Sequence, residues 1–370
     1  MSAIAPLIAT PQASFETEDD AERSSTYCYE RGWTDGLPVI APTVERVERM
    51  LAYCNRPYDQ PVARLAPRYA EATPLRIAAN AVMAGCRPDY LPLVMLALEA
   101  MTDESFNLYG IQATTHSCAP LVLVNGPIAK ELGMSCGHSA LGAGNHANAT
   151  IGRAVRLCLV NIGGAIPGIG DMATYGTPTK FTYCAAENEA ANPWEPLHVE
   201  RGFPREASTV TVAACEGPHN INDHESKTAE GILKTAAGTI ATTGQNNAHH
   251  ASDPFVLFGP EHAATIAAEG LSKRDVQQYL FENARIPLGR FAVENIERRL
   301  RKKFPERYAG AGPDTPVTMV QRPEDFNIVV IGGAGKHSAY IPTFGGTRSV
   351  TRALERSDGV YARSIGEFRS

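Results

Sequence analysis

Residues 119–127 read APLVLVNGP, an apolar run that ends in a glycine and a proline. A run of this length with that ending predicts a buried strand, a sharp turn and the start of a helix. The same order returns in residues 253–260, which read DPFVLFGP, and more loosely at 208–218 and 326–333. Repeated strand-turn-helix units predict an α/β fold with ligands near the carboxyl ends of the strands. The likeness between the first two segments suggests a weak internal duplication.

Helices outside these units are predicted from apolar side chains that recur at helical spacing. The pattern indicates helices at about 74–84, 148–162 and 293–304. Ser272 and Asp275 form a capping box, which predicts the start of a further helix.

The length of 370 residues allows two domains. We expect residues 1–24 to form a flexible arm, because alanine, proline, hydroxyl and acidic residues follow one another there without periodicity. Residues 25–205 are expected to form a first α/β half that holds a polar cleft, and residues 206–370 a second α/β half. The arm and the apolar helices favour a homo-oligomer.

Charge and cysteine usage restrict the protein class. The 34 Lys and Arg against 40 Asp and Glu give a net charge of -6, which favours neither nucleic acid nor an anionic membrane as a partner. Apolar runs are too short for a membrane span, and residues 3–9, interrupted by Pro6, do not resemble a signal peptide. Eight cysteines without a CxxC pair indicate reduced thiols. We therefore expect a cytoplasmic protein.

Polar and glycine residues crowd the stretch 116–202, which fits a cleft better than a core. Phe181 and Tyr183 suggest a strand on which Lys180 and Cys184 share one face, so that Lys180 lowers the pKa of the Cys184 thiol. The candidate proton-transfer groups are Glu187, Glu195 and His198. The alternative is a buried cysteine at a strand end, with the acidic residues capping the next element.

Two glycine-rich turns could hold a carboxylate or phosphate through backbone N–H groups. One is 142–144 before a helix, and the other is 332–336 after a strand. Neither has the spacing of a dinucleotide or Walker motif, so the sequence assigns no cofactor, and simple tight turns are the alternative. The candidate substrate-binding residues are Asn148, Arg153, Asn188, Trp33, Lys336 and His337.

A metal site is a further possibility, although no residue is assigned as a ligand. His116-Ser-Cys118 and Cys136-Gly-His138 supply two imidazoles and two thiols, but without the usual two-residue gap. The other histidine groupings are His249-His250 with Glu261-His262, and His138 with His146. Solvated or capping side chains are the alternative for these histidine groupings.

Six segments together resemble a bacterial family associated with small (seleno)proteins named for their UGSC or CGSC motif. These small proteins are in turn similar to the selenocysteine-bearing subunit of glycine reductase. The resemblance implies that a second component supplies a thiolate or selenolate nucleophile, while this chain supplies the substrate cleft. This chain has no CGSC, because its 135–138 read SCGH. The segments that carry the resemblance are RGWTDGLPV (31–39), ANAVMAGC (79–86), VNGP (124–127), ANATIGR (147–153), the block 184–198 and GPEH (259–262).

From these observations we expect an enzyme, or the large subunit of a two-component enzyme. Its substrate is expected to be small, polar and carboxylated, and its reaction to use thiol and acid-base chemistry of an oxidoreductase or lyase type. One alternative is a metal-dependent lyase or hydrolase with His and carboxylate ligands. Another is a non-catalytic scaffold subunit for a CGSC or UGSC partner.

Overall fold

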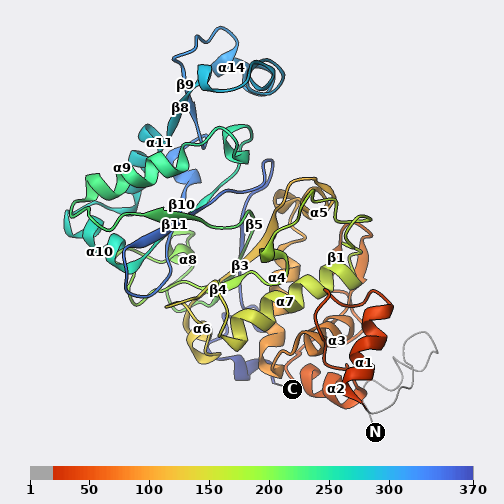
Figure 1. Cartoon of the computed structure of the whole chain (residues 1–370). Helices are drawn as coiled ribbons and strands as arrows, with labels where there is room; N and C mark the ends of the chain where they lie inside the picture. Colours follow the sequence, from red (N-terminus) through yellow and green to blue (C-terminus); the bar gives the residue numbers. More distant parts are fainter. Residues whose placement is uncertain (1–19, 370) are drawn as a thin grey trace. The chain divides into compact units, whose positions relative to one another are not determined.

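The computed structural model describes residues 20–369 and combines several small sheets with helices, which confirms the predicted α/β class (Figure 1). The chain divides into two compact units. Within the described residues, unit 1 holds 20–187, 198–214 and 349–369, and unit 2 holds 188–197 and 215–348. The units are thus not two continuous halves. The C-terminal segment belongs to unit 1 because β12 (Val350–Ala353) pairs with β5 (Thr209–Cys215).

Helical structure begins earlier than the sequence predicted. α1 spans Ala21–Glu30, and the Asp20 side chain caps it by accepting the N–H of Arg23 at 2.7 Å. Residues 20–24 are therefore not part of an arm. The remainder of the expected arm, 1–19, lies outside the described residues.

The main sheet of unit 1 has the order β12-β5-β3-β4. β3 (Ala119–Asn125) runs parallel to β4 (Cys184–Ala186), and Gly126 connects β3 to α6 (Pro127–Glu131). A Cβ atom on Gly126 would lie 2.3 Å from the Ala207 carbonyl oxygen, and its φ is 89°. Only glycine fits this turn without strain, so the strand-turn-helix unit predicted at 119 is confirmed.

Helices pack around this sheet, and the helix predicted at 74–84 has those bounds. The remaining elements of this part of the chain are α2 (Val44–Leu51), β1 (Ala63–Leu65), β2 (Ala70–Ala72), α3 (Pro74–Ala84), α4 (Leu91–Ala100), α5 (Leu108–Ala113), α7 (His146–Asn161) and α8 (Leu197–Glu200). β1 and β2 form an antiparallel hairpin, and α3 packs on α7.

The main sheet of unit 2 has the order β10-β7-β11-β6. β7 (Phe255–Phe258) is followed by Gly259 and α10 (Pro260–Ala268), as predicted. The strand-turn-helix units predicted at 208–218 and 326–333 are wrong, because each strand leads into another strand and not into a helix. β5 leads into β6 (His219–Asn222), and β10 (Asn327–Val330) leads into β11 (His337–Ile341). The reason is tertiary, because β11 pairs antiparallel with both β7 and β6 and so takes the chain that follows β10 into the sheet.

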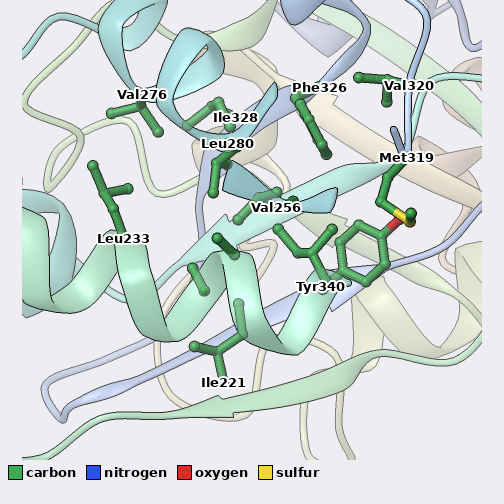
Figure 2. Packing of buried hydrophobic residues seen from close by; sticks show 14 of the residues in the cluster. Ile221, Leu233, Val256, Val276, Leu280, Met319, Val320, Phe326, Ile328 and Tyr340 are labelled. Carbon is green, nitrogen blue, oxygen red and sulfur yellow. The ribbon is translucent and has the colours of Figure 1, made fainter. Parts of the chain in front are cut away.

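The core of unit 2 lies between this sheet and its helices (Figure 2). α9 (Ala229–Ile240) and α11 (Lys273–Asn283) supply Leu233, Val276 and Leu280, and the strands supply Val256, Ile328 and Tyr340. Each fully buried aliphatic side chain of this kind contributes roughly 1.5–3 kcal/mol. The predicted capping box of Ser272 and Asp275 is present at the start of α11.

The rest of unit 2 is built from short elements. The helix predicted at 293–304 is interrupted by a π-turn at Ile296–Leu300, between α12 (Val293–Asn295) and α13 (Arg301–Lys303). The other elements here are α14 (Pro305–Tyr308), β8 (Arg285–Pro287) and β9 (Pro316–Thr318), with β8 and β9 antiparallel. Among residues 20–369, no helix combines the length and the apolar composition needed to cross a bilayer.

Candidate functional site

The carboxyl ends of β7 and β10 meet at one edge of the unit 2 sheet, because these two strands run parallel. Gly259 and Pro260 follow β7 and start α10, while the glycine-rich loop 332–336 follows β10. This edge is where α/β folds bind their ligands.

The loop at this edge is held by two side chains that reach it from elsewhere in unit 2. Asn188 donates its backbone N–H to Val330 at 2.8 Å and its Nδ2 to the carbonyl of Gly332 at 3.0 Å. The Glu261 carboxylate accepts the N–H of Gly335 at 2.7 Å. Asn188 was predicted to bind substrate, and its amide holds this loop in place.

Two imidazoles face each other beside this loop. Nε2 of His224 lies 3.0 Å from Nε2 of His337, and the rings meet edge to face at 83°. Nδ1 of His337 lies 2.9 Å from Oδ1 of Asn220, so Nδ1 carries a hydrogen and donates it. Nε2 of His337 is then the basic nitrogen, and it points at His224. We call His224 and His337 the histidine pair.

Lys336 and His262 fix the surroundings of the histidine pair. Lys336 donates its Nζ to the backbone carbonyl of His224 at 3.0 Å. His262 is buried, with Nδ1 2.8 Å from Ser338 Oγ and Nε2 2.9 Å from the carbonyl of Asp223. These bonds tie α10 to β11 and to the segment that carries His224. Both imidazoles of the pair are exposed to solvent, while these hydrogen bonds fix the segments that carry them.

The structure thus brings Asn188, Lys336 and His337 to one edge, as three of the six predicted substrate-binding residues. The sequence did not identify His224 or Asn220. The only local signal was the polar strand 219–222 followed closely by another histidine. Its significance depends on the pairing of β6 with β11, which places Asn222 opposite His337 and Asn220 opposite Ala339.

The predicted strand that would place Lys180 beside Cys184 is wrong. Lys180 lies in a 3-10 turn (Pro178–Lys180), and the strand begins only at Cys184. The Lys180 ammonium donates to both carboxylate oxygens of Asp171 at 2.6 Å. The Cys184 thiol is 4% exposed, and burial, with a smaller contribution from Cys86, raises its pKa. A raised pKa opposes nucleophilic activation.

The three predicted proton-transfer groups have different environments. Glu187 is buried and accepts a hydrogen bond from Nδ2 of Asn125 at 2.7 Å. His198 is fully buried, with Nε2 3.3 Å from the carbonyl of Arg205. Glu195 is exposed and belongs to unit 2, whereas Glu187 and His198 belong to unit 1. Burial restricts the access of a substrate to Glu187 and His198, and a role of either in proton transfer stays a prediction.

Arg153 and Asn148, predicted to bind an anion, are occupied by the protein itself. Arg153 forms a bidentate pair with Asp35, with Nε–Oδ2 at 2.8 Å and Nη2–Oδ1 at 2.9 Å. Asn148 is 2% exposed, and its amide binds both backbone groups of Ser135 and the carbonyl of Ala140. Each side chain thus holds a distant loop in place, and a role of either in substrate binding stays a prediction.

Trp33 was predicted to bind substrate. Its ring packs edge to face on Tyr27 with centroids 6.1 Å apart, and its carbonyl accepts a hydrogen bond from Asn161 at 2.9 Å. Because 39% of its surface is exposed, the side chain is partly available to a ligand.

The grouped metal ligands predicted from sequence do not assemble. In the described part of the chain, no three His, Cys, Asp or Glu side chains come together in a group that could hold a metal ion. The sets around Cys118 and Cys136, and around His249 and His262, are therefore not zinc sites of three or more ligands.

A ligand-sized cavity of about 330 Å³ lies in unit 1 and contains none of the predicted residues. Its wall includes Arg56, Arg352, Arg356 and Glu99, but no imidazole or thiol. Arg56 pairs with Glu99 at 3.2 Å, and Arg356 pairs with Glu367 at 3.3 Å. The cavity offers charged groups for binding but none suited to proton transfer near neutral pH, so the histidine pair is the better candidate for catalysis.

The chain matches no protein-family model, no curated protein and no solved structure.

Thiol labelling checks the correction at Cys184. When native protein is treated with iodoacetamide, the reagent is expected to modify the partly exposed Cys136 at least about tenfold faster than the buried Cys184. Peptide mass spectrometry over a time course measures both rates. A Cys136→Ala variant should lose the fast phase, and unfolded protein should expose all eight thiols. Faster labelling of Cys184 would contradict the structure and restore it as a nucleophile.

Proposed function

We propose that this chain is an enzyme, or the larger subunit of a two-component enzyme, that acts on a small anionic substrate by acid-base chemistry at the histidine pair. The observation that carries the proposal is the 3.0 Å separation of the two Nε2 atoms. A hydrogen bond over this distance needs one donor and one acceptor, so one Nε2 atom carries a hydrogen and the other presents a lone pair. The pair therefore offers a substrate one donor and one acceptor.

The two hydrogen bonds of His337 define where the hydrogens of the neutral pair lie. Nδ1 of His337 donates its hydrogen to Asn220, so the hydrogen between the two rings is bound to Nε2 of His224. His224 can donate its Nε2–H as a hydrogen bond to one substrate atom, while the lone pair of His337 takes a proton from a second atom of the substrate and returns it to a third. The pair can thus catalyse isomerisation without net proton exchange.

Charge supports an anionic substrate. Lys336 places an ammonium beside the pair at the carboxyl edge of the sheet, in the loop 332–336 whose Gly335 N–H is already bound to the Glu261 carboxylate. A carboxylate or phosphate bound there would bring the adjacent carbon within reach of the imidazoles.

Under this proposal, the thiol that was expected to take part in the reaction does not belong to this chain. Cys184 is buried and its pKa is raised, so a thiolate or selenolate, where the reaction uses one, comes from the CGSC or UGSC partner that the resemblance implies. A scaffold without catalysis is the alternative, and a homo-oligomer remains a prediction. Comparing turnover by the wild-type and His337→Gln proteins decides between enzyme and scaffold.

The same distance favours a second candidate, a metal-dependent lyase or hydrolase. Two nitrogens each about 2.1 Å from a metal and at about a right angle lie about 3.0 Å apart. The hydrogen bond from His337 to Asn220 is the kind of outer contact that orients a metal-binding imidazole. A divalent ion held by two histidines keeps open positions for water and for an anionic substrate.

Metal titration tests this second candidate. If it is correct, tag-free wild-type protein binds one equivalent of Co²⁺ or Zn²⁺ in calorimetry, and His337→Gln weakens binding at least about tenfold. His219→Gln is the matched control, because His219 is an exposed histidine of the same strand pair. Absence of binding by wild-type protein, or equal loss in both variants, would rule out a metal at the pair and leave the acid-base role.

A further inference from the structure

Unit 1 buries more positive than negative charge around Asp171. Nη2 of Arg156 lies 2.9 Å from Oδ2 of Asp171, and Nζ of Lys180 lies 2.6 Å from Oδ1. The side chains of Arg156, Lys180 and Asp171 are only 10%, 13% and 4% exposed. Two cations therefore share one carboxylate, and the group carries one excess positive charge. A buried charge without a counterion is costly.

A small cavity lies on the cation side of this group. Its wall includes Arg156, Lys180, Gln112 and Thr179, whereas Asp171 does not line it. The other wall residues are apolar or aromatic except for Cys118, and the wall contains no carboxylate. Its volume of about 10 Å³ gives room for one water-sized particle.

One lining residue of this cavity has a donor without an acceptor. Gln112 is 1% exposed, and its Nε2 has no hydrogen-bond partner among residues 20–369. Its backbone carbonyl accepts the N–H of Met172 at 3.3 Å, which holds Gln112 next to Asp171. Arg156 uses Nη2 for Asp171 and for the carbonyl of Ala165. A buried amide donor left unsatisfied calls for an acceptor in the cavity.

We propose that this cavity is a binding site for a single small anion, with chloride as its ordinary occupant. The excess charge of Arg156 and Lys180 selects an anion, and the Gln112 amide supplies a further donor. Space for one water-sized particle suits a monatomic anion better than a carboxylate or phosphate, which bring three or more heavy atoms. The site is separate from the histidine pair and does not depend on the proposed function.

Thermal unfolding in matched salts tests the site. At equal ionic strength, unit 1 of the wild-type protein is expected to melt about 2–4 °C higher in sodium chloride than in sodium gluconate. The excess ³⁵Cl NMR line width of a chloride solution should rise on adding the protein and saturate with chloride concentration.

Variants separate a specific site from general salt effects. Lys180→Met removes the excess charge and should abolish both the chloride-dependent melting shift and the line broadening. Lys130→Met removes an exposed lysine of unit 1 and should retain both. Gln112→Leu keeps every charge and should raise the chloride concentration needed by about tenfold, which tests the site even if Lys180→Met fails to fold. Equal melting in both salts without broadening by the wild-type protein would show that the cavity holds water only and overturn the proposal.

Discussion

Replacing Asp171 with alanine is expected to lower the free energy of unfolding of unit 1 by about 3–5 kcal/mol. The carboxylate accepts hydrogen bonds from Lys180 at 2.6 Å and from Arg156 at 2.9 Å, and all three side chains are largely buried. Its removal leaves two cations facing each other in a site with little water. Breaking a buried ion pair by deleting one partner is costly for this reason.

One tryptophan in each unit makes the loss measurable. Trp33 belongs to unit 1 and Trp194 to unit 2, and the chain has no other tryptophan. In a Trp194→Phe background, urea unfolding followed by fluorescence reports on unit 1. Glu71→Ala is the control, because Glu71 forms an exposed pair with Arg64 at 2.8 Å and should cost at most about 1 kcal/mol. Equal costs for the two substitutions would contradict the buried charge group.

The effect of Asp171 should also depend on pH. Burial alone would raise the pKa of Asp171, but the hydrogen bond and charge of Lys180 and the charge of Arg156 outweigh it and hold the pKa below its ordinary value. The stabilisation is therefore complete above the unfolded-state pKa of about 3.9 and is lost as the pH falls through the lower folded-state pKa. The Asp171→Ala protein should lack this part of the acid destabilisation.

Replacing His337 with glutamine is expected to lower kcat/KM by about 10²–10⁴-fold if the histidine pair transfers protons. Glutamine retains hydrogen-bonding groups but cannot take up a proton near neutral pH. Substrates can be found by incubating the protein, with and without a CGSC partner, with small carboxylates and phosphate esters and following their consumption by mass spectrometry. The kinetic constants are then compared on the substrate found.

Two further variants show whether a loss of kcat/KM comes from proton transfer by the histidine pair. His224→Gln should be as damaging as His337→Gln, and the double variant little worse than either, because the two imidazoles act as a unit. His219→Gln should change kcat/KM by no more than about twofold, since its side chain lies outside the pair. Turnover by His337→Gln at the wild-type rate would reject the acid-base role and favour the scaffold alternative.

Local signals in the sequence were enough to predict several elements. The helix at 74–84 has its predicted bounds because Thr73 caps its start, Pro74 suits its first turn, and Gly85 ends it with a φ of 88°. The capping box at Ser272 and the units at 119 and 253 were predicted for the same reason. Each of these features depends on residues only a few positions apart.

The segment around Lys180 shows where local patterns fail. Phe181 and Tyr183 suggested a strand, but Phe181 is 46% exposed. Lys180 forms an ion pair with Asp171, nine residues earlier. A charge partner across a loop therefore outweighed the alternating pattern. Arg153 shows the same effect over a longer span, because its partner Asp35 lies 118 residues away in the sequence.

The sequence by itself determined the α/β class, the strand-turn-helix units at 119 and 253 and the bounds of several helices, because capping, turn residues and hydrophobic period act within one or two turns of chain. It also placed Asn188, Lys336 and His337 among the candidates. Only the tertiary structure decided which side chains meet. His224 and His337 are 113 residues apart, and the antiparallel pairing of β6 with β11 brings them together. Strand pairing is a long-range contact, so no local pattern could indicate that two exposed histidines form one site.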